Sequence, residues 1–207
     1  LLGVNHAPCQ FAESTGMRYF AGPLHGFQWL LTRHPVVTEL WKTTRAPSRA
    51  AVFTTVANWS TSGLKDIDWR GKKYLWSKSR EFLRFIAAPK RADETFEMAT
   101  NINDSRTRKK FEQNDWRLSS PLQMSVDYWL YRDYIQRSKG EFTVAKDQYI
   151  RLNTGWFSDR SACYLAAGRP VITQETGFTK NYGGKAGLLS FRTLDEIANA
   201  VRTINAD

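Results

Sequence analysis

The chain has 207 residues, of which 42% are hydrophobic and 14% aromatic, so it can bury a large core and does not have the composition of a disordered chain. No run approaches the roughly 18 to 20 apolar residues of a membrane-spanning helix, and two cysteines, Cys9 and Cys163, are too few for a disulfide framework. The formal charge of +10 predicts an anionic partner: nucleic acid, an acidic membrane surface or a phosphorylated small molecule.

The first 48 residues differ from the rest of the chain. They carry glycines, prolines and two tryptophans, Trp29 and Trp41, without a helical or strand period. We expect residues 1–48 to be the tail of another domain with its linker, for which Thr44 to Arg49 (TRAPSR) is the candidate, and residues 49–207 to form one domain.

The next part of the chain alternates apolar runs with helical patterns. Ala51 to Val56 (AVFTTV) predicts a strand, and Lys78 to Ala87 (KSREFLRFIA) predicts a helix that Pro89 ends. A second strand is predicted over Thr95 to Ala99, before a basic surface helix over Ser105 to Asn114 (SRTRKKFEQN).

A third helix is predicted from Ser125 to Arg137, and its pattern turns three large side chains toward the core, namely Trp129, Leu130 and Tyr134. Lys139-Gly140 ends this helix before a strand over Glu141 to Lys146 (EFTVAK). That strand leads into the most informative segment of the chain.

The segment from Gly155 to Phe178 reads GWFSDRSACYLAAGRPVITQETGF. Ser158 is a plausible N-cap for a small-residue helix over Ser161 to Ala167, which Gly168 closes. Pro170 to Gln174 (PVITQ) then predicts a buried strand.

The last unit has the clearest pattern. Leu188 to Phe191 predicts a strand, and Thr193 to Glu196 forms a capping box before Ile197, Val201 and Ile204 at helical spacing. Five strands alternating with helices predict an α/β fold, with a Rossmann-like parallel sheet and helices on both faces.

Parallel sheets bind ligands at the carboxyl ends of their strands, where helix N-termini present unpaired N–H groups to phosphate. Two predicted loops supply such a place, Thr154 to Arg160 and Glu175 to Thr179. Lys146, Arg151 and Arg160 could add formal charge to those N–H groups.

A purely structural explanation of the same residues is also open. Gly168-Arg169-Pro170 and Gly177 are ordinary turn residues, and the alanines of the predicted helix are small enough to allow close packing on a sheet. Each basic residue, taken alone, is more often a solvated surface charge.

The stretch FSDRSACYLAAGRPVITQETGF, preceded by EFTVAKDQYIRLNTGW, resembles the donor-binding segment of bacterial GT-B glycosyltransferases. The stretches FTTVANW and YLWSKSREFLRF resemble a branch of the same superfamily. The likeness covers about residues 50–207 and is most specific between Glu141 and Phe178.

This resemblance implies a metal-independent transferase with two Rossmann-like domains and no cofactor, in which the C-terminal domain holds a nucleoside-diphosphate sugar. The chain would then contain that domain and only the tail of the acceptor-side domain. The two cysteines lie in unlike contexts, which predicts a reducing, cytoplasmic location. The residues expected to bind the donor are Thr54, Thr55, Lys146, Arg151, Gly155, Ser158, Asp159, Arg160, Ser161, Glu175, Thr176 and Gly177.

The sequence departs from the family at one point. Retaining members place two glutamates around this helix with seven residues between them, whereas Gly155 and Cys163 stand at those positions here. Asp159 and Glu175 are the nearest acidic groups and could contact a ribose or sugar hydroxyl. The catalytic residues, the acceptor and the anomeric outcome stay open, and a non-catalytic nucleotide-binding relative is an alternative.

Nucleic-acid binding is the main rival function, because a basic chain with eight tryptophans could track phosphates and stack bases. Its best local support is Arg106 to Lys110, although a charged helix face is usually only solvated. A peripheral contact with an acidic membrane is compatible with the same charge. His6, His25 and His34 are weak candidates for a catalytic base, and no metal-binding motif is present.

Overall fold

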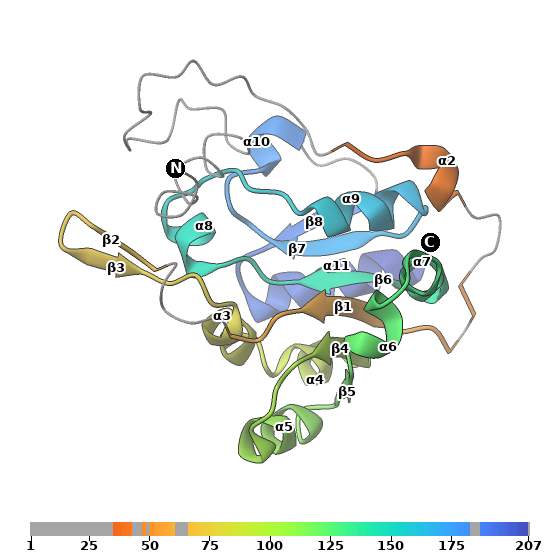
Figure 1. The fold of residues 1–207 in the computed structure, drawn as a ribbon, viewed down its shortest axis with the longest axis horizontal. Helices are drawn as coiled ribbons and strands as arrows, with labels where there is room; N and C mark the ends of the chain where they lie inside the picture. Colours follow the sequence, from red (N-terminus) through yellow and green to blue (C-terminus); the bar gives the residue numbers. More distant parts are fainter. Residues whose placement is uncertain (1–34, 43–46, 49, 61–65, 183–186, 207) are drawn as a thin grey trace.

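The computed structural model describes residues 35–42, 47–48, 50–60, 66–182 and 187–206 (Figure 1). Most of the predicted domain tail, most of the predicted linker, and His6, His25 and His34 lie outside these residues. The division of the chain at residue 48 therefore stays a prediction.

Six parallel strands form the central sheet, in the order β5-β4-β1-β6-β7-β8. They are β1 (Phe53–Ala57), β4 (Phe96–Thr100), β5 (Trp116–Ser119), β6 (Gly140–Thr143), β7 (Val171–Gln174) and β8 (Leu188–Phe191). The predicted Rossmann-like α/β fold is confirmed. The strand order reverses direction between β1 and β6, and such a switch point is where open parallel sheets bind ligands.

Helices cover both faces of the sheet (Figure 1). One face packs against α3 (Ser79–Arg84), α4 (Ala88–Ala92), α5 (Ser105–Glu112) and α11 (Leu194–Ala206). The other face packs against α2 (Thr38–Trp41), α7 (Tyr128–Arg137) and α9 (Asp159–Ala166). Three short helices lie in connections, namely α6 (Leu122–Ser125), α8 (Asp147–Arg151) and α10 (Thr179–Tyr182).

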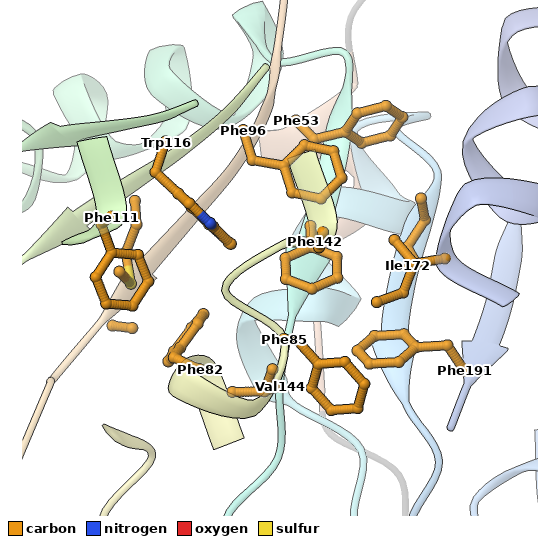
Figure 2. Packing of buried hydrophobic residues seen from close by; sticks show 14 of the residues in the cluster. Phe53, Phe82, Phe85, Phe96, Phe111, Trp116, Phe142, Val144, Ile172 and Phe191 are labelled. Atoms are coloured by element: carbon orange, nitrogen blue, oxygen red, sulfur yellow. The ribbon is translucent and has the colours of Figure 1, made fainter. Parts of the chain in front are cut away.

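The two faces of the sheet differ in chemistry because side chains alternate along a strand. Phe142 points into an aromatic core, where it stacks on Phe96 with ring centroids 4.8 Å apart and on Phe191 at 5.3 Å (Figure 2). Its neighbours Glu141 and Thr143 point to the opposite face, under α9. The apolar face supplies most of the core, and the polar face builds the site described below.

One sequence prediction is wrong, and two elements of the structure were not predicted. Pro89 does not end a helix but stands in the first turn of α4, because proline lacks only an N–H that is unpaired there anyway. Strand β5 was not predicted, since its four residues include Arg117 and are too few for a period. The hairpin of β2 (Ile67–Trp69) and β3 (Lys72–Tyr74), which projects from the body in Figure 1, was also missed.

Helix α7 faces differently from the prediction. Trp129 and Leu130 are 54% and 47% exposed, whereas Ile135 is fully buried. The Asp127 side chain caps the helix by accepting two backbone N–H groups, and the packing of Ile135 in the core sets the rotation of the helix. Tyr134 is partly buried, as expected, but it donates a hydrogen bond to Glu97.

The predicted helix ends are largely confirmed. Thr193 and Glu196 exchange hydrogen bonds between side chain and backbone N–H at the start of α11. Ser158 is the N-cap residue of α9, although its hydroxyl makes no capping bond. Gly168 follows α9 with a φ of +68°, a conformation that favours glycine.

The contrast between Phe142 and Trp129 gives a direct test of this fold. We expect Phe142→Ala to lower the free energy of unfolding by about 3 to 5 kcal/mol, because it leaves a cavity between two stacked rings. Trp129→Ala should change it by less than about 0.5 kcal/mol, as for other exposed positions. Urea denaturation measures both values, and equal effects of the two substitutions would contradict this packing.

Candidate functional site

The N-terminus of α9 lies at the switch point between β1 and β6, and Arg160 ties it to both strands. The Arg160 Nε lies 2.5 Å from the Glu141 Oε1 of β6. One terminal nitrogen donates to the Val56 carbonyl at 2.6 Å, and the other donates to the Thr143 Oγ1 at 2.7 Å. The guanidinium therefore bridges the carboxyl ends of the two strands.

The Arg160–Glu141 pair is buried. The Arg160 side chain is 13% exposed and Glu141 is not exposed at all. Desolvation lowers the pKa of Arg160, but the facing Glu141 carboxylate, together with Tyr131 and Tyr164, holds that pKa above its ordinary value. Arg160 is thus a permanent, rigidly held cation beneath the helix.

Lys78 is a second cation at this place, and the sequence analysis did not assign it to the site. It immediately precedes α3 and is only 8% exposed, with its Nζ 5.4 Å from the centroid of the Trp156 ring. Burial first, and the Arg160 charge second, lower the pKa of Lys78 well below its ordinary value. Lys78 follows the first strand of a Rossmann unit, where such folds bind phosphate, and this position could have suggested a role for Lys78 in the site.

Five charged residues act on one another here, and we call them the charge cluster: Lys78, Glu141, Lys146, Asp159 and Arg160. Three are basic residues and two are carboxylates, so the cluster carries a net positive charge when Lys78 is protonated. The Glu141 Oε2 and the Ser161 Oγ are buried without a hydrogen-bond partner among the described residues. An excess of positive charge beside unpaired polar atoms favours an anionic, hydrogen-bonding ligand.

The two predicted loops meet beside the cluster. Gly155, with a φ of +72°, donates its N–H to the Thr176 carbonyl at 2.7 Å. The Thr176 hydroxyl returns a bond to the Trp156 carbonyl at 2.6 Å. Glu175 accepts the N–H of Gly177, so its carboxylate shapes the second loop.

Ser158, Asp159 and Ser161 surround the start of α9. Asp159 accepts the Arg160 N–H at 2.8 Å and the Ser158 hydroxyl at 3.3 Å through the same oxygen. Asp159 is exposed, whereas both serines are buried. The three residues expected at the helix start are therefore brought together with Arg160.

Lys146 and Arg151 each lie over an aromatic ring, that of Trp76 and that of Tyr74 respectively. The Lys146 Nζ lies 3.1 Å from the centroid of the Trp76 ring, and its charge still reaches Lys78. Arg151 turns away to the β3 hairpin strand, where it donates to the Lys73 carbonyl and pairs with Asp147 at 3.1 Å. Its position is explained by this packing, and it does not join the charge cluster.

The two threonines of β1 are also placed by the sheet. Thr54 lies on the polar face, 2.6 Å from the hydroxyls of both Ser138 and Tyr164. Thr55 points the other way, is fully buried and has an unpartnered hydroxyl. Thr54 therefore joins α7 and α9 to the sheet.

Cys163 stands where the resembled family has a glutamate, and it supplies no charge. Burial, followed by the nearby Asp159 carboxylate, raises its pKa to about 11. The thiol stays protonated at neutral pH and cannot replace a carboxylate.

A cavity of about 730 Å³ opens at the carboxyl ends of β1, β4 and β5, next to the charge cluster. Its polar lining includes Asn58, Asn101, Asn103 and Thr100, whose hydroxyl has no described partner. Val56 lines the cavity and also accepts the hydrogen bond from Arg160. The cavity and the charge cluster therefore meet at Val56, although none of the five cluster residues lines the cavity.

The chain matches no protein-family model and no curated protein. Among the described residues, no three side chains of metal-binding type come together, and no helix is both long and apolar enough to cross a membrane.

Removing the carboxylate of the buried pair should be costly. We expect Glu141→Gln to lower the free energy of unfolding by about 3 to 5 kcal/mol, because it leaves the Arg160 charge uncompensated. The control is Asp195→Asn, which breaks an exposed pair with Arg91 and should cost less than about 1 kcal/mol. Chemical denaturation compares the two, and a similar small loss in both would show that the buried pair is not held as described.

Lys78 should oppose folding of the empty protein. Its pKa is lower in the folded chain than in the unfolded chain, so the unfolded chain binds more protons and stability rises with pH. We expect Lys78→Met to raise the free energy of unfolding, by more at about pH 7 than at about pH 9.5, where the unfolded lysine also begins to lose its proton. Denaturation at both pH values measures this, and a destabilised Lys78→Met protein would argue against the burial.

Proposed function

We propose that this chain binds a nucleoside-diphosphate sugar at the β1–β6 switch point and acts as the donor-binding part of a glycosyltransferase. The observation that carries the proposal is the pair of buried basic residues, Arg160 in the first turn of α9 and Lys78 before α3, whose charges act on each other. Cations with little solvent around them and too few carboxylates nearby are suited to a polyanion.

The diphosphate would lie against the start of α9. Three of the five N–H donors of Arg160 are used by Glu141, Val56 and Thr143, so two remain for phosphate oxygens. The first backbone N–H groups of the eight-residue helix α9 add donors and a partial positive charge. Lys78 supplies an ammonium group, which hydrogen-bonds to no acceptor among the described residues.

The nucleoside would occupy the neighbouring cavity. Its three asparagine amides can pair with the hydrogen-bonding edge of a base or with ribose hydroxyls, and Ile102, Pro121 and Leu122 give apolar contact to a ring. Val56 lines the cavity and accepts from Arg160, so the proposed nucleoside and diphosphate positions are adjacent at the end of β1.

In sugar transfer, the bond between the sugar and the diphosphate breaks and negative charge develops on the departing phosphate. Fixed cations and backbone N–H groups stabilise that charge without reorganising, which is the largest contribution that such a site can make. Asp159 and Glu175 each use one oxygen on the loop backbone and keep the other for a ligand hydroxyl. The base, the acceptor and the anomeric outcome are not assigned.

Small-ligand binding tests the proposal against its rivals. A nucleoside-diphosphate sugar at about a hundred times its Kd should add about 2.7 kcal/mol to the free energy of unfolding. We expect a thermal-shift panel to find one such ligand, Lys78→Met to lose most of the shift, and Lys109→Met on the exposed side of α5 to keep it.

The rivals predict other results. A nucleic-acid-binding protein would bind single strands with an affinity that falls steeply with salt, and it would be weakened by Lys109→Met. A non-catalytic relative would bind the sugar nucleotide and release no free nucleoside diphosphate in the presence of acceptors. Failure of every sugar nucleotide and nucleoside diphosphate to stabilise the protein would overturn the proposal.

A further inference from the structure

The Lys78 ammonium is nearly enclosed by protein but lacks a partner of its own. The residue is 8% exposed, and among the described residues no carboxylate lies within salt-bridge distance of its Nζ and no acceptor hydrogen-bonds to it. An ammonium in such a place loses most of its hydration and gains only the Trp156 ring, 5.4 Å from its Nζ, and two carboxylates beyond salt-bridge distance. The burial of the Lys78 ammonium without a salt bridge or a hydrogen bond needs a physical explanation.

The charges that face Lys78 come from three elements. Arg160 and Asp159 belong to α9, Glu141 belongs to β6, and Lys146 precedes α8. Both carboxylates are already engaged, Glu141 by the Arg160 guanidinium and Asp159 by the Arg160 backbone N–H. In the empty site, the cations therefore leave Lys78 with more repulsion than attraction.

We propose that Lys78 is uncharged while the site is empty and takes up one proton when the diphosphate of the donor binds. The inference rests on the proposed function, because it needs that anion beside Lys78. Lysine suits this role, since it changes its charge readily when buried, whereas arginine stays charged.

The sign of the effect follows from the two states of the site. Burial and the Arg160 charge lower the pKa of Lys78 in the empty protein, and a diphosphate beside the Nζ raises that pKa again. Between those two pKa values the complex holds one more proton than the free protein. The affinity for the donor is then strongest at the acid side of that range and falls as the pH rises.

Isothermal titration calorimetry measures the proton directly. The probes are UDP-glucose, GDP-mannose, ADP-glucose and dTDP-glucose, whose diphosphates carry no titrating group between about pH 6 and pH 8.5. At one pH, the binding enthalpy is measured in buffers that differ in ionisation enthalpy, and the slope gives the number of protons taken up. We expect a slope near one proton, and a Kd that rises about tenfold for each pH unit within the range.

Three variants assign the proton to its residue. Lys78→Arg keeps a cation that does not titrate, so its binding should show no proton uptake and little pH dependence. Lys78→Met should also show no uptake and should bind more weakly. Lys109→Arg, on the exposed side of α5, is the matched control, and it should keep the uptake of the unaltered protein.

The outcomes separate this inference from the function it rests on. A probe that binds without proton uptake, or uptake that persists in Lys78→Arg, overturns the role of Lys78 and leaves the proposed function standing. If none of the four probes binds, the proposed function fails and this inference fails with it.

Discussion

The buried contact between Arg160 and Glu141 is the interaction on which the rest of this site depends. A fully buried carboxylate is tolerated only with a partner, and Arg160 supplies it with geometry that also reaches Val56 and Thr143. The contact fixes where α9 begins relative to β1 and β6. The cavity, the two loops and Lys78 all take their places around that helix start.

The two faces of the sheet have different roles, one in the core and one in the site. On one face, stacked and edge-on rings around Phe142 form a rigid aromatic core, which supplies the apolar burial. On the other face, Thr54, Glu141 and Thr143 point at α7 and α9 and bond to polar side chains. Because successive residues of one strand serve opposite faces, the core and the site are built from the same short segments.

Lys78 illustrates the conflict between stability and binding. The folded chain holds a desolvated lysine beside another cation, which opposes folding, and only an anion can reverse the penalty. Such a residue is unexpected in a domain shaped by stability alone, whereas it is typical of a binding site. The same reasoning accounts for the unpartnered hydroxyl of Ser161 close by.

Local sequence determined the kinds of elements and many of their ends. The capping box at Thr193, the cap position of Ser158 and the strand over Leu188 to Phe191 depend on residues a few positions apart, so the pattern is enough. The same pattern placed Arg160 at a helix start facing the strand ends.

Only the tertiary structure decided which side chains meet. Val56 and Arg160 are 104 positions apart, and they touch because β1 and β6 are neighbours in the strand order. The fold places Lys78 and Glu141 in the charge cluster, although the sequence did not predict them there. Arg151 instead bonds to the Lys73 carbonyl of the hairpin and lies outside the cluster. The rotation of α7, which exposes Trp129, was likewise set by packing. Periodicity fixes the face that a segment can bury, but long-range pairing decides what that face meets.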